Sequence, residues 1–322
     1  MRIKLIDGNS VGFAQQHAQD ARPHDGSPRH AVFGMLRHIR NSLYFETNSL
    51  HVVVWDGRAE WRYAHHPQYK STRHLPEAAR QARLEYEAQR PLVQEALSHF
   101  PVLQLTHPKA EADDVAFGLS RILPLHGYST TLFTADRDWL QLVGPQVRWV
   151  NARPPHQVVT PENFAENTGF ANPAAFALAK ALVKDTSDDI QGLPGIGPVT
   201  AQKILQTYGT LEAFEAYLAN TSPAERKHPL SKLDSAAASA LIRFNLPLVN
   251  LTLGPTLLGS DVQLCLGEAN DLELYSFLMD HGLTEFMDDF EHFFQPLTAD
   301  VRTLLCNLAG LIRENLESAW QE

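Results

Sequence analysis

The chain has 322 residues, of which 44% are hydrophobic, enough to bury a core of domain size and too many for an intrinsically disordered protein. Its two cysteines, Cys265 and Cys306, lack His or Cys neighbours at metal-ligand spacing, which argues against a disulfide framework and a zinc site. No apolar stretch approaches the roughly 18 to 20 residues that span a bilayer, so no membrane partner is expected. The formal net charge of −10 means that contacts to nucleic acid would need a local cluster of Lys and Arg.

Five short runs of apolar and β-branched residues predict the strands of a sheet. They are Ile3 to Ile6, Val52 to Trp55, Val102 to Leu105, Leu132 to Thr134 and Val147 to Val150. Helix-forming stretches separate these runs, and the alternation favours an α/β fold with a mostly parallel sheet flanked by helices. We assign residues 1–170 to this lobe.

Carboxylates follow three of the predicted strands. Asp7 follows the first, Asp56 the second, and Asp136 and Asp138 the fourth. In open α/β sheets, ligands bind in the crevice outside the carboxyl ends of the strands. The sequence therefore predicts that these acids converge at one edge of the sheet.

Two further acidic clusters occur, Glu111 with Asp113 and Asp114 at the start of a predicted helix, and Asp185 with Asp188. Each cluster alone has an ordinary explanation as a helix cap or a turn. Several such clusters at one crevice are hard to explain without a cation. Hard divalent ions prefer carboxylate oxygens, and two ions roughly 4 Å apart can cleave a phosphodiester, so Mg²⁺ or Mn²⁺ is favoured over zinc.

Helical patterns dominate from about Asn163 onward. Residues 174–184 and 198–206 carry Ala, Leu and Ile at helical spacing and predict a smaller helical lobe at residues 171–260. Residues 299–321 carry an apolar stripe that is typical of a terminal helix, and we expect residues 261–322 to be a helical extension that packs on the body.

The segment Gly192-Leu193-Pro194-Gly195-Ile196-Gly197 lies between two predicted helices. Its glycines permit a tight hairpin whose backbone amides can approach a phosphate without a charged side chain. This indicates DNA binding that does not depend on base sequence, and a plain turn between helices is the alternative explanation.

Taken in order, these motifs resemble the 5′-nuclease or flap endonuclease family, which includes bacteriophage 5′-3′ exonucleases and the 5′-nuclease domain of bacterial DNA polymerase I. The resemblance spans most of residues 1 to 255. It rests on Ile6-Asp7-Gly8-Asn9, Asp56-Gly57 with Arg62, Tyr69-Lys70-Ser71-Thr72-Arg73, Glu111-Ala112-Asp113-Asp114, Thr134-Ala135-Asp136-Arg137-Asp138, Asp185 to Asp188, and Gly192 to Gly197. It implies a PIN-like sheet with a two-metal site, a helical arch at about residues 58–95, and a helix–three-turn–helix DNA-binding lobe.

The resemblance also implies roles for individual residues. Asp7, Asp56, Glu111 and Asp113, with Asp114 close by, would serve one metal ion, and Asp136, Asp138, Asp185 and Asp188 the other. Lys70 and Arg73 would stabilise negative charge at the scissile phosphate. Contacts to DNA are implied for Arg62, Tyr69, Arg80, Arg83, Gly192, Gly195, Ile196, Gly197, Thr200 and Lys203.

Competing explanations exist for some of these residues. Tyr69 is compatible with a place in the core, and Arg83 with an ion pair to Glu87 on a helix surface. Lys70 could help to deprotonate the attacking water only if its pKa were lowered. The arch region nevertheless has a local excess of basic charge, because residues 58–90 contain seven Lys and Arg against four Asp and Glu, a net charge of +3.

Two positions depart from the family pattern. Lys184 stands where Gly is common, and Val199 stands where Lys is common, two residues after the hairpin. A phosphate contact is therefore expected to be missing at Val199, and Lys203, one turn further along, is the candidate to replace it. The hairpin carbonyls of relatives can hold a potassium ion, and K⁺ at this hairpin is a hypothesis.

We expect a monomeric, stand-alone 5′-3′ exonuclease and flap endonuclease that acts during replication or repair. Its substrates would be DNA with a 5′ flap or free 5′ end, or RNA primers, and replication proteins are candidate partners. The first predicted strand leaves no room for a signal peptide, so the cytoplasm of a bacterial cell or a phage-infected host is expected. The alternatives are a PIN-like ribonuclease, a catalytically weak DNA-junction-binding scaffold and a small-molecule phosphatase.

Overall fold

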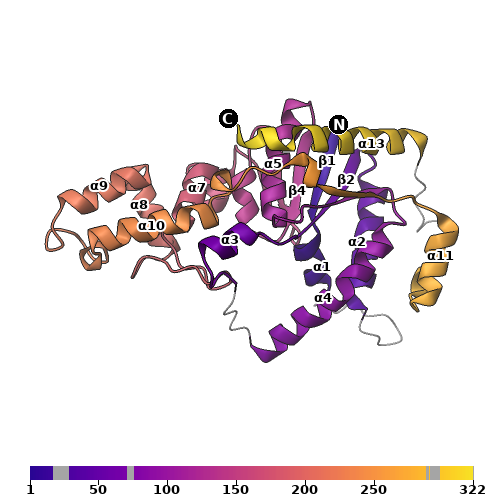
Figure 1. The fold of residues 1–322 in the computed structure, drawn as a ribbon, viewed down its shortest axis with the longest axis horizontal. Coiled ribbons are helices and arrows are strands. Elements are labelled where there is room, and N and C mark those ends of the chain that lie inside the picture. The colour runs from indigo at the N-terminus through magenta and orange to yellow at the C-terminus, as the bar shows by residue number, and fades with distance from the viewer. Residues whose placement is uncertain (17–28, 71–75, 288–289, 291–297, 322) are drawn as a thin grey trace.

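A seven-stranded sheet forms the centre of the larger lobe in the computed structural model, which describes residues 1–16, 29–70, 76–287, 290 and 298–321 (Figure 1). The strand order is β6-β5-β4-β1-β2-β3-β7. The strands are β1 (Arg2–Asp7), β2 (Ser49–Trp55), β3 (Val102–Thr106), β4 (Ser129–Thr134), β5 (Val147–Asn151), β6 (Val158–Val159) and β7 (Gln263–Leu266). β1 to β5 pair in parallel, and the two edge strands β6 and β7 are antiparallel to their neighbours.

The five parallel strands are the five predicted from the sequence. The apolar runs of β1 to β4 are buried along nearly their whole length, as is typical of parallel strands covered on both faces, whereas β5 buries Val147 and Trp149 only. The register pairs Asp7 with Val54 and Ile6 with Phe133, so β1, β2 and β4 end at the same edge of the sheet. The acids that follow these strands are therefore brought to one place.

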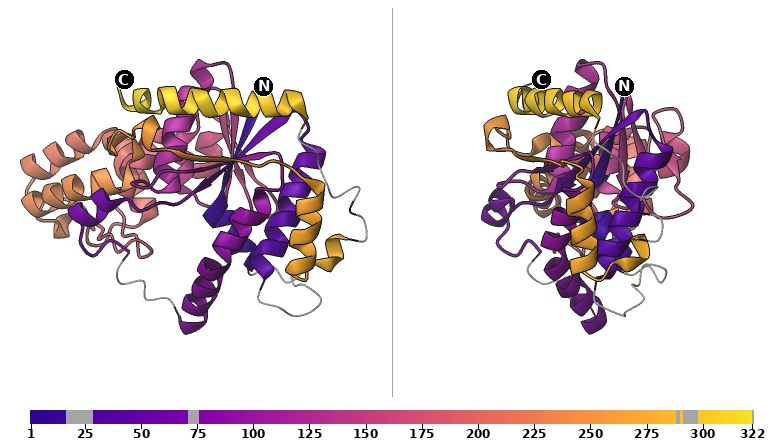
Figure 2. Two further views of the ribbon diagram at one scale, coloured as in Figure 1. Left: turned by 45° about the vertical axis from the view of Figure 1, so that its right-hand side comes forward. Right: turned by 90° about the vertical axis from the view of Figure 1, so that its right-hand side faces the viewer.

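Helices cover both faces of the sheet (Figures 1 and 2). One face carries α1 (Gly8–Gln16), α2 (His30–Phe45), α4 (Glu77–Leu97) and α11 (Asp271–Asp280), which pack in one apolar cluster with Val53 and Phe133. The other face carries α5 (Ala112–Leu125) and α13 (Ala299–Asn315), which pack in a second cluster with Leu5 and Val52. The short helix α3 (Glu60–His65) lies towards the smaller lobe in Figure 1, and α6 (Phe164–Thr168) precedes that lobe in the chain.

The smaller lobe extends away from the sheet and has a core of its own (Figure 1). Its helices are α7 (Pro173–Lys180), α8 (Pro198–Tyr208), α9 (Leu211–Asn220) and α10 (Ser235–Val249). Phe214 and Ile242 are fully buried in this core. Asn172, Thr210 and Asp234 cap α7, α9 and α10 by accepting a hydrogen bond from a first-turn amide, which explains where these helices begin.

Short 3₁₀ helices complete the chain at η2 (Asp138–Leu142), η3 (Leu230–Lys232), η4 (Leu251–Leu253), η5 (Gly259–Asp261), η6 (Thr284–Phe286) and η7 (Leu316–Trp320). β7 was not predicted: it lies in the segment expected to be a helical extension, and it adds an antiparallel edge to β3. β7 has only four residues and none of them is fully buried, so its hydrophobic pattern is too weak to predict a strand from the sequence. No helix in the described residues is long and apolar enough to cross a membrane.

Candidate active site

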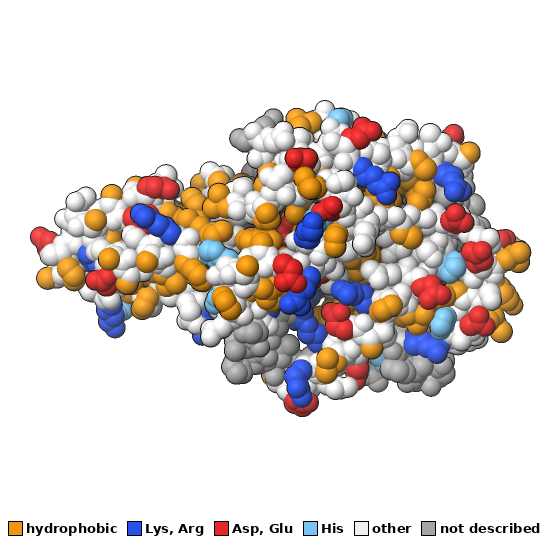
Figure 3. Space-filling view, in the orientation of Figure 1, with side chains coloured by type: hydrophobic (Ala, Val, Ile, Leu, Met, Phe, Trp, Pro, Cys, Tyr) orange, Lys and Arg blue, Asp and Glu red, His pale blue; other side chains and the backbone are white. Residues whose placement is uncertain are grey.

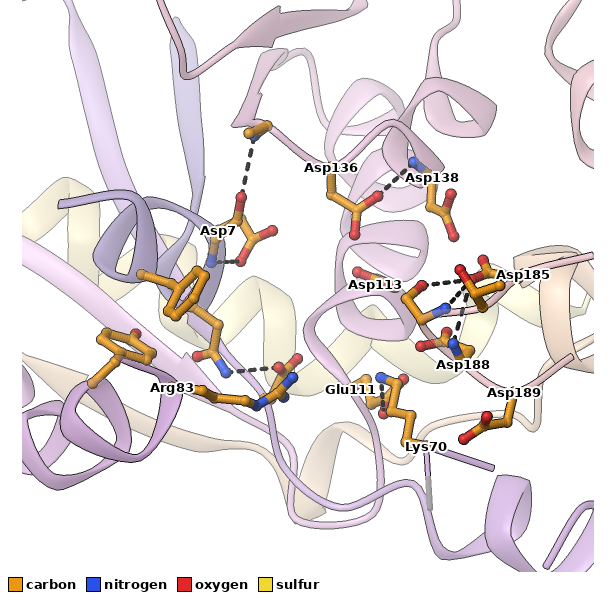
Figure 4. Close-up of a pocket in the computed structure, with 18 of the residues that line it drawn as sticks. Asp7, Lys70, Arg83, Glu111, Asp113, Asp136, Asp138, Asp185, Asp188 and Asp189 are labelled. Atoms are coloured by element: carbon orange, nitrogen blue, oxygen red, sulfur yellow. Dashed lines mark hydrogen bonds and ion pairs between the residues drawn. The ribbon is translucent and has the colours of Figure 1, made fainter. Parts of the chain in front are cut away.

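A pocket of about 1050 Å³ opens at the strand edge where the acids converge. It is lined by every carboxylate predicted to bind metal except Asp114, namely Asp7, Asp56, Glu111, Asp113, Asp136, Asp138, Asp185 and Asp188. Figure 4 shows Asp136 and Asp138 facing Asp113, Asp185 and Asp188 across the pocket, with Asp7 to one side and Lys70 below. The sheet lobe supplies all these acids except the pair Asp185 and Asp188.

Asp7 is fixed at the end of β1. Its Oδ1 accepts a hydrogen bond from the Ser10 amide at 2.8 Å, and its Oδ2 accepts one from Thr134 Oγ1 at 2.8 Å. The next residue must be small, because a Cβ on Gly8 would lie 2.5 Å from the Trp55 ring. Burial, reinforced by the charges of Asp56 and Asp136, raises the pKa of Asp7 to about 7.

Asp56 follows the last residue of β2 and lies beside the first residue of α5. Its Oδ1 accepts a hydrogen bond from the Ala112 amide at 2.8 Å, and its Oδ2 accepts one from Asn9 Nδ2 at 2.6 Å. Gly57 is required here, since a Cβ would lie 2.0 Å from the His107 carbonyl oxygen. Burial and then the nearby charge of Glu111 raise the pKa of Asp56.

The first turn of α5 presents Glu111 and Asp113 to the pocket. Glu111 and Asp114 form a capping box, in which each side chain accepts a hydrogen bond from the other residue's amide. Asp113 Oδ1 accepts a hydrogen bond from Trp139 Nε1 at 2.7 Å. Burial, followed by the charges of Asp136 and Asp56, raises the pKa of Asp113 well above its usual value.

Asp136 and Asp138 follow β4 in a tight turn. Asp136 Oδ1 accepts a hydrogen bond from the Asp138 amide at 2.8 Å. Burial and the Asp138 charge raise the pKa of Asp136 to about 6. Asp138 itself forms an ion pair with Lys180, the last residue of α7, so a cation from the smaller lobe reaches into the pocket.

Asp185 and Asp188 lie in a loop between α7 and the hairpin. The backbone of Asp185 exchanges two hydrogen bonds with that of Ile190, at 2.9 and 3.0 Å, which closes the loop. The Ser187 amide donates to Asp185 Oδ1 at 2.8 Å. Burial opposes ionisation of Asp185, but the hydrogen bonds from Ser187 and the charge of Lys180 outweigh it and lower its pKa.

Lys70, which follows α3 in the chain, forms an ion pair with one of the pocket acids. Its Nζ lies 2.7 Å from Glu111 Oε1, and its amide donates to the Asp188 carbonyl at 3.3 Å, where Lys70 has a φ of 55°. Burial lowers its pKa, but the charges of Glu111 and Asp188 more than compensate, so the net shift is upward. In the metal-free site the direction of this shift favours the ammonium form, and deprotonation of water by Lys70 stays an untested alternative. Its predicted catalytic partner Arg73 lies outside the described residues.

Four predicted site residues are placed elsewhere by the structure. Arg62 is 2% exposed, and its guanidinium binds both oxygens of Asp114 at 2.5 and 2.6 Å, so Arg62 is not positioned for DNA and Asp114 is not free for metal. Tyr69 is 2% exposed, and its hydroxyl lies 3.0 Å from Glu111 and 3.2 Å from Asp188, which makes it a buried bridge between acids. Ile196 is 5% exposed and packs in the core of the smaller lobe.

The other predicted DNA contacts remain accessible to different degrees. Arg83 lines the pocket, whereas Arg80 pairs with Glu77 on the surface of α4. In the hairpin, Gly195 has a φ of 77°, a conformation that favours glycine, and Gly197 precedes Pro198 at the start of α8. No side chain caps α8, and its first described backbone hydrogen bond is from the Ala201 amide to Gly197, so the amides of Val199 and Thr200 face outward. Gly192 is half-buried, and Lys203 is exposed on α8.

Three cations at the pocket were not predicted as site residues. Lys180 pairs with Asp138, and Arg153 and Lys184 line the pocket wall. The sequence signal for Lys180 and Lys184 was their position just before Asp185, although lysines on a predicted helix are more often solvated. In the face shown in Figure 3, Lys and Arg side chains gather near the middle of the molecule beside acidic groups.

The donor set fits hard divalent cations. The carboxylates are crowded and largely buried, which leaves their negative charges without enough compensation and raises several of their pKa values. Within the described residues, no three His, Cys, Asp or Glu side chains close around a single point as a ready cage. An open ring of oxygen donors around a wide pocket suits an ion that keeps several of its waters, as Mg²⁺ does.

We expect divalent metal to stabilise the protein more at pH 8 than at pH 5.5. The folded-state pKa values of Asp7 and Asp136, about 7 and about 6, lie above those of the unfolded chain, so ionising these acids costs stability as pH rises through this window. A bound cation removes that cost. The measurement is the increase in Tm on adding Mg²⁺ at each pH, and an equal increase at both would contradict the prediction.

Comparing each pH with and without metal is necessary because two buried histidines act in the opposite direction. Burial lowers the pKa of His38 to about 3 and that of His51 to about 4. Stability from these neutral histidines is lost as pH falls from about 6.5 towards those values. Their contribution is the same with and without metal and cancels in the difference.

The fold and site together define a nuclease: a PIN-like sheet lobe with a carboxylate pocket, joined to a helical lobe. Residues 2–169 match the 5′-3′ exonuclease N-terminal resolvase-like domain, and residues 171–253 match the 5′-3′ exonuclease C-terminal SAM fold. The chain therefore belongs to the 5′-3′ exonuclease family, and the predicted fold class is confirmed.

Individual relatives agree with this assignment. The chain is 30% identical to DNA polymerase I of Thermus aquaticus over 253 residues, which are 77% of this chain and 29% of that protein, so it spans less than a third of that relative. It resembles the structure of bacteriophage T5 5′-exonuclease with bound zinc ions at a TM-score of 0.64 and 20% identity, covering 98% of this chain and 100% of that one. The T5 D15 flap endonuclease in complex with DNA and metal ions gives 0.60 at 23% identity, covering 78% and 89%.

Proposed function

We propose that the protein is a divalent-metal-dependent 5′-3′ exonuclease and flap endonuclease that hydrolyses phosphodiesters in flapped or branched DNA. The observation that carries the proposal is the pocket in which carboxylates of the sheet lobe meet Asp185 and Asp188 beside the helical lobe. The pocket carboxylates would bind metal, and the backbone amides at the start of α8 in the smaller lobe would bind a phosphate. Neither contact depends on the bases, so the protein would recognise the shape of DNA and not its base sequence.

Mg²⁺ is the proposed cofactor, with two ions per site and Mn²⁺ able to substitute. One ion would be held by Asp7, Asp56, Glu111 and Asp113, and the other by Asp136, Asp138, Asp185 and Asp188. When bound, such a pair lowers the pKa of a water and stabilises the leaving oxygen of an in-line displacement. Asp114 has no part in this set, because both of its oxygens bind Arg62.

The chain's own residues supply binding and charge. The outward amides at the start of α8 would hold a phosphate of the duplex, and the helix dipole favours the negative charge. The Lys70 ammonium, kept protonated by Glu111, would lie against the scissile phosphate and stabilise the charge that develops as the bond breaks. Cleavage would leave a 5′-phosphate and a 3′-hydroxyl.

A potassium ion at the hairpin of residues 192–197 remains part of the proposal. The hairpin turns tightly, since the Ile196 amide donates to the Leu193 carbonyl at 3.0 Å. Gly195 adopts its positive φ beside Pro229, whose Cβ is 3.2 Å from the position of a Cβ at Gly195. Carbonyl oxygens are suitable ligands for such an ion. DNA affinity measured in potassium and in sodium chloride of equal concentration tests this, and equal affinity would count against the ion.

The substrate experiment uses a 5′-flap DNA labelled at either end, with Mg²⁺ titrated. Cuts near the junction, and mononucleotides released from a free 5′ end, are the expected products. Preference for unstructured RNA would indicate a ribonuclease, and tight flap binding without any cleavage would indicate a junction-binding scaffold. Turnover of phosphate monoesters alone would indicate a phosphatase. RNA-primed flaps in the same assay test the proposal that primers are removed in replication or repair.

We also propose a monomer that works in the cytoplasm of a bacterial cell or a phage-infected host alongside replication proteins. The support for a monomer is that each lobe buries its own apolar cluster within one chain. Light scattering at several protein concentrations tests it, and a mass of twice 36.0 kDa at all of them would contradict it.

A further inference from the structure

Three of the cations at the pocket are already paired with acids. Lys70 binds Glu111, Lys180 binds Asp138, and Arg62 binds Asp114. In the metal-free site, a paired ammonium or guanidinium attracts an incoming phosphate less strongly than an unpaired one, because its carboxylate repels the same phosphate. Cations without such a partner therefore decide where a phosphodiester backbone can enter this acidic pocket.

Lys184 is a cation of that kind. It lines the pocket, its side chain is exposed, and its ammonium has no hydrogen bond or ion pair among the described residues. An exposed Lys is ordinary on most surfaces. Here it stands immediately before Asp185, at the rim of a pocket whose other lining groups are mostly acidic.

The backbone on both sides of Lys184 is tightly fixed. Leu182 accepts a hydrogen bond from the Leu193 amide at 2.9 Å, and Asp185 is locked to Ile190. Gly192 packs directly against this segment, since a Cβ on Gly192 would lie 2.2 Å from the backbone nitrogen of Lys184. Lys184 is thereby held between the carboxylate loop at residues 185–190 and the hairpin at residues 192–197.

The first turn of α8 lacks the charge that Lys184 provides. Val199 is 64% exposed there, beside the outward amides that would face phosphate. The helix offers the DNA hydrogen-bond donors and an apolar side chain but no cation until Lys203, a turn later. In the segment from residue 184 to residue 203, which joins the pocket to α8, Lys184 is the cation that lines the pocket.

We propose that Lys184 binds a backbone phosphate of the DNA at the pocket rim, and that this contact takes over the part that a cation on the first turn of α8 would play. Lys184 is then a positioning residue that sets where the strand enters relative to the carboxylates. This inference rests on the proposed nuclease function, and it concerns which residue binds the strand and not which residues cleave it.

The test is binding of 5′-flap DNA in EDTA by fluorescence anisotropy across a series of salt concentrations. Lys184→Met should weaken binding roughly tenfold at low salt and reduce the slope of log Kd against log salt by about 0.7 to 0.9, the loss of one phosphate contact. Lys184→Arg should keep both the affinity at low salt and the slope of the wild type. Adding Val199→Lys to Lys184→Met should restore the slope. In cleavage assays with metal, Lys184→Met should raise KM by a larger factor than it lowers kcat.

Lys109→Met is the matched control. Lys109 is also an exposed Lys in the larger lobe, but it pairs with Asp261 and does not line this pocket, so it should leave the salt slope unchanged. An unchanged slope in Lys184→Met, or weaker binding without a change in slope, overturns the inference. If the wild type cuts flaps while Lys184→Met binds normally, the proposed function stands and only the inference fails. If the wild type binds no flap DNA, both fail.

Discussion

Asp136→Asn should cut a 5′-flap DNA more slowly than the wild type by on the order of 10³-fold, while its affinity for the flap is retained or increased. The expected loss corresponds to about 4 kcal/mol of the barrier, within the several kcal/mol that metal ions contribute to such reactions. Asn can still accept the hydrogen bond from the Asp138 amide that Asp136 Oδ1 accepts at 2.8 Å, so the turn should keep its shape. What is removed is one negative charge at the pocket.

The measurement is single-turnover cleavage over a Mg²⁺ titration, with binding measured separately in EDTA. A weakened metal site should also need more Mg²⁺ for its residual rate. Asp189→Asn is a suitable control, because Asp189 lines the same pocket but is outside the predicted metal set. Its rate should lie much closer to that of the wild type. Equal losses in the two variants would mean that pocket charge, and not a metal ligand, was removed at Asp136.

Arg62→Met should reduce the free energy of unfolding by about 3 to 5 kcal/mol, the range for breaking a buried ion pair. The Arg62 guanidinium binds both oxygens of Asp114 and lies 3.3 Å from Glu111, and the Arg62 and Asp114 side chains are 2% and 1% exposed. Met fills similar space but leaves the Asp114 carboxylate buried without a counter-charge. Chemical denaturation of the metal-free protein at pH 8 measures the effect.

Two further variants separate this explanation from a simple loss of packing. Asp114→Asn added to Arg62→Met should recover much of the lost stability, because the uncompensated charge is gone while an oxygen remains to accept the Glu111 amide. Arg58→Met removes an arginine from the same segment whose partner Glu60 is exposed, and it should change stability by less than about 1 kcal/mol. No recovery in the double variant would mean that the charge is not the cause.

The sheet and the convergence of the acids could be predicted because they depend on local patterns. A buried parallel strand must be apolar along its length, so β1 to β5 are visible as runs, and the ends of parallel strands meet at one edge. The roles of Lys70 and Asp185 came from the family resemblance and not from such patterns. β7 could not be predicted, because its pairing with β3 is decided by packing between segments more than 150 residues apart.

The errors at the site have one physical origin. Arg62, Tyr69 and Asp114 have the right chemistry for contacts to phosphate or metal, and sequence gives their chemistry but not their burial. In the structure, all three are buried and bonded to other side chains. The Arg62 guanidinium binds the Asp114 carboxylate, and the Tyr69 hydroxyl bridges Glu111 and Asp188. Lys184 is the reverse case, an ordinary surface lysine in the sequence that the fold places at the pocket rim.

The origin of the carboxylates in two separately packed lobes has a consequence for how the activity can fail. Asp185 and Asp188 belong to a loop anchored by the core of the smaller lobe, whereas the other acids are anchored by the sheet. If the smaller lobe melts first, half of one metal's proposed ligands leave together with α8, the helix proposed to hold DNA. A nascent chain likewise has no complete site until residue 188 has been made and its lobe has docked. If the proposed ligand set is right, a damaged or unfinished molecule should therefore be inactive and not an unselective nuclease.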